Sequence, residues 1–198
     1  MEKRNEICTI IGYGINNYNE NLRNVIKAYE IRTVNNYNYL PIENKVVWIL
    51  CHGIFFKEQV KLNCIDINSL CIKNDCIGFD IKKLQKKSYF GFAFNIKENI
   101  FIIPQDLLKL LNCYNCDIII DSCYSGYLNE YFIESLVQRK NRIFTCGTNK
   151  EINSKYSGSE LNNFLLKNKD ILYDNIKLNQ KIKIYNEKNN GFYLALYY

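Results

Sequence analysis

The fold is decided by residues 116–126, Cys-Asp-Ile-Ile-Ile-Asp-Ser-Cys-Tyr-Ser-Gly. The isoleucines at 118–120 are β-branched and favour a strand, and a strand that is apolar on both faces is typical of the middle of a parallel sheet. The chain then breaks at Asp121-Ser122-Cys123 and turns at Gly126. Because ligands of open α/β sheets collect at the carboxyl ends of strands, Cys123 is a candidate nucleophile.

A cysteine nucleophile needs a base, and the chain holds a single histidine, His52. A second apolar run, residues 45–51, ends directly at His52-Gly53. If the two strands are neighbours, they bring the thiol and the imidazole to one edge of the sheet, and the intervening chain is long enough for a crossover connection. A lone histidine is otherwise more often a satisfied core or surface residue, but the cysteine strand favours a catalytic interpretation.

The two motifs together resemble those of the caspase-like cysteine peptidases (clan CD), and within that clan those of the metacaspases and their bacterial relatives. Metacaspases carry Asp-Ser-Cys-His-Ser-Gly or close variants, and residues 121–126 here read Asp-Ser-Cys-Tyr-Ser-Gly, with His52-Gly53 upstream. The resemblance spans residues 7–166 in outline. It implies a caspase-like three-layer α/β sandwich, with a mostly parallel central sheet flanked by helices and small β-hairpins.

The resemblance also implies an activity, that of a cysteine endopeptidase that cleaves after Arg or Lys. Cys123 would attack the scissile carbonyl as a thiolate, and His52 would protonate the leaving amine and then activate water. The backbone N–H groups of Gly53 and Cys123 are the expected oxyanion donors. In this clan a Cys–His dyad usually suffices, so no third catalytic residue is predicted.

The substrate pocket is predicted from the residues around these motifs. Asp121 precedes Cys123 by two residues and shares its side of the strand; in metacaspases the matching Asp forms the pocket floor, where a carboxylate binds a basic side chain. The alternative is an acid that caps the following helix. Leu50 stands where metacaspases often carry a small polar residue. Their Asn-Asp pair is reduced to Asn24, with Glu20 as a candidate substitute for the Asp.

No cofactor or metal is expected to be required. Many metacaspases need calcium, but the segment after Gly53 carries only scattered acids, whereas a calcium site needs six to eight oxygen ligands. Calcium dependence is therefore not favoured. The acids in question are Glu58, Asp66, Asp75 and Asp80.

Two rival interpretations stay open. One is a catalytically silent caspase-fold protein that acts as a binding partner or regulator, although the presence of both Cys123 and His52 argues against it. The other is a zinc or redox module built on Cys113-Tyr-Asn-Cys116. One CxxC pair without a second at zinc-finger spacing is a weak signal. The further cysteines of that module would be Cys64, Cys71 and Cys76.

Composition predicts a globular chain. With 198 residues, 47% hydrophobic and 23% charged, a single peptidase domain over residues 1–198 without a separate prodomain is expected. No apolar run approaches the roughly 20 residues of a membrane span, and no signal peptide is evident. A cytoplasmic location is therefore expected, in which the nine cysteines would be free thiols.

The predicted partners are polypeptide substrates with a basic residue before the cleaved bond, and neither a membrane nor a nucleic acid. The net charge is +6, but the lysines are scattered rather than gathered in a basic stripe. The oligomeric state is not predicted.

Hydrophobic periodicity gives the expected order of elements. Helices are predicted up to residue 29 and over 127–138 and 160–167, and a proline at 104 is expected to open a further helix. Hairpins are predicted within 54–62, over 89–103, and around the turn at 189–191. The remaining predicted strands are 7–12, 45–51, 142–147, 181–185 and 192–197.

Overall fold

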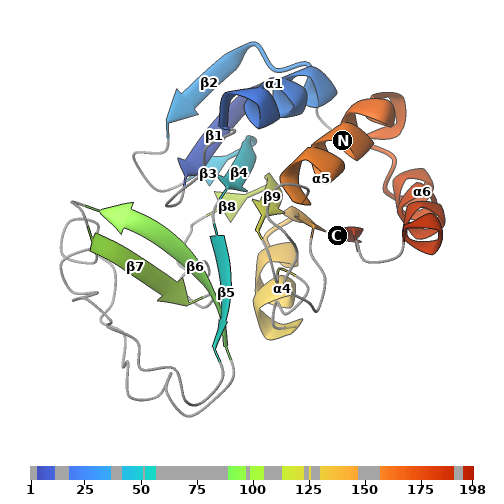
Figure 1. The fold of residues 1–198 in the computed structure, drawn as a ribbon. Helices are drawn as coiled ribbons and strands as arrows, with labels where there is room; N and C mark the ends of the chain where they lie inside the picture. Colours follow the sequence, from blue (N-terminus) through green and yellow to red (C-terminus); the bar gives the residue numbers. More distant parts are fainter. Residues whose placement is uncertain are drawn as a thin grey trace.

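The computed structural model describes residues 4–11, 18–36, 42–50, 52–56, 89–96, 99–104, 113–122, 125, 130–146, 157–189 and 194–198. Within these ranges the chain forms a mixed α/β fold with a mostly parallel central sheet flanked by helices, drawn in Figure 1. The expected hairpin beyond residue 56, the acids at 58–80 and the helix expected after residue 104 lie outside the described residues.

The central sheet has the strand order β11-β10-β9-β4-β1-β2. Five of these strands run parallel, and β11 pairs antiparallel to β10. Every residue of β4 and β9 is buried, as predicted for two apolar runs in the middle of a parallel sheet. The strands are β1 Glu6–Ile11, β2 Thr33–Asn36, β4 Val46–Leu50, β9 Asp117–Asp121, β10 Arg142–Cys146 and β11 Leu194–Tyr197.

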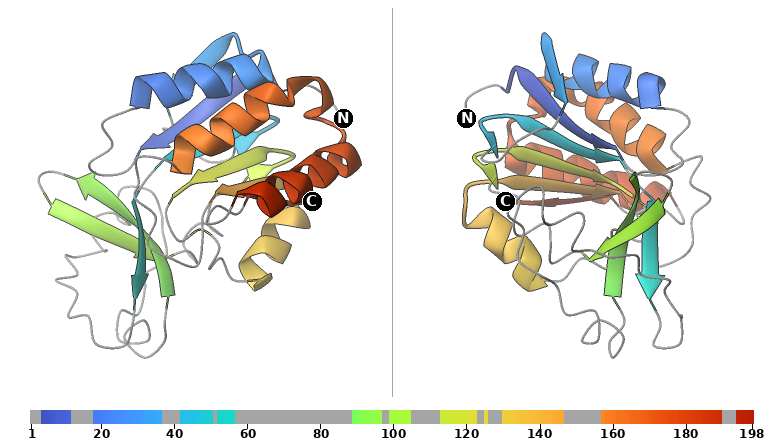
Figure 2. Two further views of the ribbon diagram at one scale, coloured as in Figure 1. Left: turned by 45° about the vertical axis from the view of Figure 1, so that its right-hand side comes forward. Right: turned by 90° about the vertical axis from the view of Figure 1, so that its left-hand side faces the viewer.

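Helices cover both faces of this sheet. Figure 2 shows α1, α5 and α6 on one side and α4 on the other. The two faces have separate cores, one containing Trp48, Phe144 and Leu165 and the other containing Ile118, Ile133 and Leu136. The helices are α1 Tyr18–Tyr29, α4 Glu130–Val137, α5 Ser157–Lys167 and α6 Asn175–Lys188, with a 3₁₀ turn, η3, at Lys169–Ile171.

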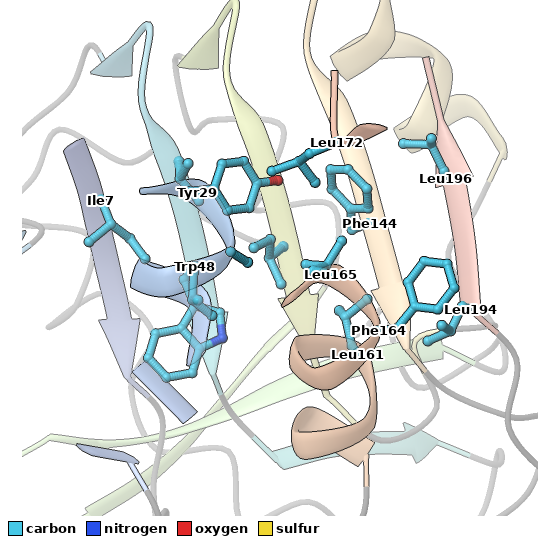
Figure 3. Packing of buried hydrophobic residues seen from close by; sticks show 14 of the residues in the cluster. Ile7, Tyr29, Trp48, Phe144, Leu161, Phe164, Leu165, Leu172, Leu194 and Leu196 are labelled. Atoms are coloured by element: carbon cyan, nitrogen blue, oxygen red, sulfur yellow. The ribbon is translucent and has the colours of Figure 1, made fainter. Parts of the chain in front are cut away.

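The core on the α1 side contains large side chains from five strands and three helices. Figure 3 shows Trp48 of β4 on this face with aromatic and leucine side chains of α5 and β10. Burying each such side chain contributes roughly 1.5–3 kcal/mol. The predicted inward residues of the 160–167 helix, Leu161, Phe164 and Leu165, all lie in this core.

Two small sheets accompany the central one. β5 (His52–Phe56), β6 (Tyr89–Ile96) and β7 (Asn99–Pro104) form an antiparallel sheet, which confirms the predicted 89–103 hairpin. Pro104 ends β7, so its predicted place at the start of a helix is wrong. β3 (Ile42–Glu43) pairs parallel with β8 (Cys113–Tyr114).

The predicted strand at 181–185 is wrong, because these residues belong to α6. The side chain of Asp174 accepts a hydrogen bond from the Lys177 backbone N–H and caps the helix. Leu178 and Ile182, four residues apart, are buried, whereas Ile184 is 45% exposed. The terminal hairpin around 189–191 is therefore also wrong, and β11 pairs with β10 instead.

The free side of β11 is met by α6. The side-chain amide of Asn186 donates to the Leu194 carbonyl at 2.9 Å and accepts from the Leu194 N–H at 2.9 Å. One helical side chain thus satisfies both peptide groups at the start of this edge strand.

Among the described residues, no helix is long and apolar enough to cross a membrane.

Asn141, which is 1% exposed, holds the turn before β9. Its amide nitrogen donates to the carbonyls of Cys113 and Leu136, and its oxygen accepts from the Cys116 N–H, each at 2.9 Å. Since Cys113 ends up in β8 and Cys116 directly before β9, one side chain connects the CxxC turn to the end of α4.

Replacing Asn141 with alanine is expected to destabilise the fold by about 2–4 kcal/mol, because a buried N–H and two carbonyls lose their partner. Urea denaturation followed by circular dichroism measures this change. Asn189→Ala is the control, since the exposed Asn189 amide also donates to a carbonyl, that of Tyr185. Equal urea midpoints for Asn141→Ala and the unmodified protein would contradict this role.

Candidate active site

β4 and β9, the strands that precede the two sequence motifs, end at one edge of the sheet. The strands are parallel neighbours, and Leu50 pairs with Asp121 at their carboxyl ends. His52 begins β5 two residues after β4 ends. Cys123 follows β9 by two residues and lies outside the described residues. The condition set by the sequence, that the two strands be neighbours, is met, and the position of the thiol stays a prediction.

His52-Gly53 opens a strand rather than a loop. β5 pairs antiparallel with β6, with His52 opposite Ala93 and Gly53 opposite Phe92. In Figure 1, β5 leads from the edge of the central sheet into the three-stranded sheet. The predicted roles of His52 as the base and of the Gly53 N–H as an oxyanion donor depend on a bound substrate and stay predictions.

Asp121 is buried, with 2% of its surface exposed. The indole N–H of Trp48 donates a hydrogen bond to its Oδ2 at 3.4 Å, and Figure 3 shows Trp48 on the α1 and α5 side of the sheet. Burial raises the pKa of Asp121 to about 7, and the Trp48 hydrogen bond partly opposes that rise. A carboxyl group that is buried with only the neutral Trp48 donor among the described residues is costly to ionise, which is why its pKa is raised.

The raised pKa of Asp121 has a definite effect on stability. An unfolded aspartate has a pKa near 3.9, so between about pH 4 and pH 7 the folded chain holds a proton that the unfolded chain has released. The free energy of unfolding therefore falls as the pH rises through this window, because only the unfolded chain releases the proton.

Asp117, the other buried acid of β9, is satisfied differently. Arg142 donates to it through two nitrogens, with Nε at 2.8 Å from Oδ1, and the Nε of Arg4 lies 3.9 Å from Oδ1. Asp117 and both arginines are at most 2% exposed. β9 thus carries one acid paired with guanidinium groups at its amino end and one acid held by an indole at its carboxyl end.

The other predicted pocket residues have different surroundings. Leu50 is 4% exposed and belongs to the core that also contains Trp48. Glu20 lies exposed in the first turn of α1, and Asn24 is half-buried one turn further along. The structure therefore brings Leu50 next to Asp121, while Glu20 is at the surface of a helix start.

Trp48 is a residue that the sequence analysis did not assign to the site. It precedes Leu50 by two residues, so strand alternation places both on the same face. Once β4 is paired with β9, the same alternation also puts Asp121 on that face. Strand alternation in the sequence predicts that Trp48 and Leu50 share a face. It does not predict that β4 pairs with β9 in the register that brings Trp48 to Asp121.

Cys8, Cys113 and Cys116 are free and buried. The Cys116 Sγ lies 3.4 Å from the carbonyl oxygens of both Ile42 and Tyr114, and a hydrogen bond from Cys113 lowers the pKa of Cys116. In the part of the chain that the structure describes, no group of three or more metal-ligating side chains occurs. The further cysteines of the zinc interpretation lie outside that part.

Comparisons with known proteins do not identify a family for this chain. No protein-family model matches the chain, and no curated protein is significantly similar to it.

Proposed function

We propose that the protein is a cysteine endopeptidase of caspase-like type, which cleaves peptide bonds after Arg or Lys with Cys123 and His52 as its dyad. One observation carries the proposal: β4 and β9 are parallel neighbours, with Leu50 opposite Asp121. One motif begins at Asp121 and the other begins two residues after Leu50, so both follow strands that end at the same edge of the sheet. Carboxyl-end edges of parallel sheets are where α/β enzymes bind ligands.

The proposed reaction needs little beyond these two side chains. His52 takes the proton of the Cys123 thiol, and the sulfur attacks the scissile carbonyl to form a tetrahedral oxyanion. Collapse breaks the C–N bond as His52 gives the proton to the leaving amine. A water molecule activated by His52 then hydrolyses the thioester. Each backbone N–H that binds the oxyanion is worth about a hundredfold or more in rate.

The preference for Arg or Lys is assigned to Asp121. A carboxyl group two residues before the nucleophile is well placed to bind a cationic side chain by a charge-assisted hydrogen bond. Burial makes an unpaired Asp121 carboxylate costly, so a cation that pairs with it removes that cost.

The test is covalent labelling followed by cleavage profiling. A peptidyl-arginine carrying a thiol-reactive ketone is expected to label Cys123 alone among the nine cysteines, as read by peptide mass spectrometry. The matched probe ending in glutamate should label at least about tenfold more slowly. A peptide library, with and without calcium, should be cut after Arg and Lys. Labelling spread over several cysteines, or no cleavage of any peptide, would favour a silent binding protein instead.

A further inference from the structure

The two buried acids of β9 pose a question about charge. Asp117 and Asp121 are four residues apart on one strand, point to the same face and are each at most 2% exposed. Guanidinium groups of Arg142 and Arg4 approach Asp117. Among the described residues, the ion pairs of β9 involve Asp117 and not Asp121. Asp121 instead accepts a hydrogen bond from the neutral indole of Trp48.

A carboxylate buried with a single neutral donor is unfavourable, whereas the same group bound to a guanidinium is stable. The Arg142–Asp117 pair shows the second arrangement within this strand. A guanidinium or ammonium group that enters from solvent would provide Asp121 with a positively charged hydrogen-bond donor, as Arg142 does for Asp117. Asp121 is the last residue of β9, at the carboxyl end of the strand, and the proposed substrate would bind at this end.

We propose that Trp48 is a specificity-determining residue, whose indole N–H holds the Asp121 carboxyl until a cationic substrate side chain binds and displaces a proton from it. This inference rests on the proposed function, because the cation is the side chain that precedes the cleaved bond. The step is balanced: neutral Asp121 and a cationic substrate give an Asp121 carboxylate paired with that cation, and one proton leaves to solvent. Recognition of basic substrates is thus linked to proton release.

The raised pKa of Asp121, about 7, is consistent with this exchange near neutral pH. Burial raises this pKa, and the Trp48 hydrogen bond partly opposes the rise. Other titratable groups stand on the surrounding elements, and the test has to separate them from Asp121. Within the described residues these include Cys146 on β10, which pairs with Asp121, together with His52 on β5, Glu20 on α1, Glu160 on α5 and Asp117 at the other end of β9.

The kinetic test compares two peptides that differ only in charge, one with arginine and one with citrulline before the cleaved bond. Titration of His52, Cys123 and the surrounding acids affects both peptides, so the ratio of their kcat/KM values isolates the cation. That ratio is expected to rise about thirtyfold from about pH 5.5 to about pH 8, as the Asp121 carboxyl loses its proton. In Asp121→Asn the ratio should stay near one at every pH.

Trp48→Phe keeps an aromatic ring but removes the donor that favours the carboxylate. The rise of the ratio should move to higher pH, and the ratio at pH 7 should fall about fivefold. A merely structural role for Trp48 would lower turnover of both peptides together and leave the ratio unchanged. Melting temperatures confirm that each variant is folded.

A second readout needs no turnover, because Trp48 is the single tryptophan of the chain. In Cys123→Ala, tryptophan fluorescence should titrate with a midpoint near 7, and benzamidine, a small guanidinium-like cation, should move that midpoint to lower pH. Asp121→Asn should lose the titration. An active enzyme with a flat ratio overturns the inference alone. An inactive protein in which benzamidine still shifts the titration contradicts the proposed function and supports the cation site, and one without that shift overturns both.

Discussion

Replacing Cys123 with alanine is expected to lower kcat/KM for arginine-ended peptides by about a thousandfold or more, to the rate without added enzyme. The sulfur forms the covalent bond to substrate in the proposed reaction, and alanine offers no atom in its place. His52→Ala should cause a loss of the same order. Because the two residues act as one unit, the double variant should be no worse than either single one. Fluorogenic peptide assays measure all three.

The control for this prediction is a cysteine of the central sheet, Cys8. Cys8 on β1 is a free thiol with 6% exposure, and Cys8→Ala makes the same chemical change and should keep most of the activity. Equal activity of Cys123→Ala and the unmodified protein would rule out the dyad. Loss of activity in Cys8→Ala together with a lower melting temperature would show that core damage alone reduces turnover.

Replacing Asp117 with asparagine is expected to destabilise the fold by about 3–5 kcal/mol. The change keeps the shape of the side chain but leaves the buried guanidinium groups of Arg142 and Arg4 without their negative partner. Arg142 also donates to the Leu172 carbonyl at 2.7 Å, so the damage should extend from β10 to the turn before α6. Urea denaturation gives the free energy, and hydrogen exchange locates the weakened region.

Glu6→Gln provides the matched control for Asp117→Asn. Glu6 is paired with Lys45 through side chains that are 34% and 32% exposed, so removing its charge should cost at most about 1 kcal/mol. A similar loss in free energy of unfolding for the two variants would contradict the prediction that the buried ion pairs of Asp117 stabilise the fold more than the partly exposed Glu6–Lys45 pair.

The sequence predicted the middle of the fold because burial leaves a plain signal there. β4 is apolar at every position, β9 has three isoleucines between its two aspartates, and the motif after each strand indicated where the strand ends. The helix ending at Tyr29 was equally clear, since Leu22 and Val25 repeat with helical spacing and are buried.

The error at 181–185 has a physical cause. Lys-Ile-Lys-Ile-Tyr alternates like a strand, yet only Ile182 is buried, whereas Ile184 faces solvent. The decisive residues were Asp174, which caps the helix, and Leu178, one turn before Ile182. Both stand outside the alternating stretch, so a short window favoured the wrong period.

The candidate site was predicted only as far as single strands allow. Cys123, His52 and Asp121 stand out by residue type and by position after apolar runs. The Trp48–Asp121 contact depends on which strands pair and in which register, and that is a property of the folded sheet. The contrast between Asp117 and Asp121 likewise depends on Arg142 and Arg4, which are far from Asp117 in the sequence. Sequence periodicity does not show that the fold brings these two arginines to Asp117.

The contact between Asn186 and Leu194 bears on how the protein behaves at high concentration. An outermost strand invites other chains to extend the sheet, which is a common route to aggregation. At Leu194 both outward peptide groups already have partners in the amide of Asn186. A neighbouring chain would have to displace that amide before it could add a strand there, which protects the protein against self-association along β11.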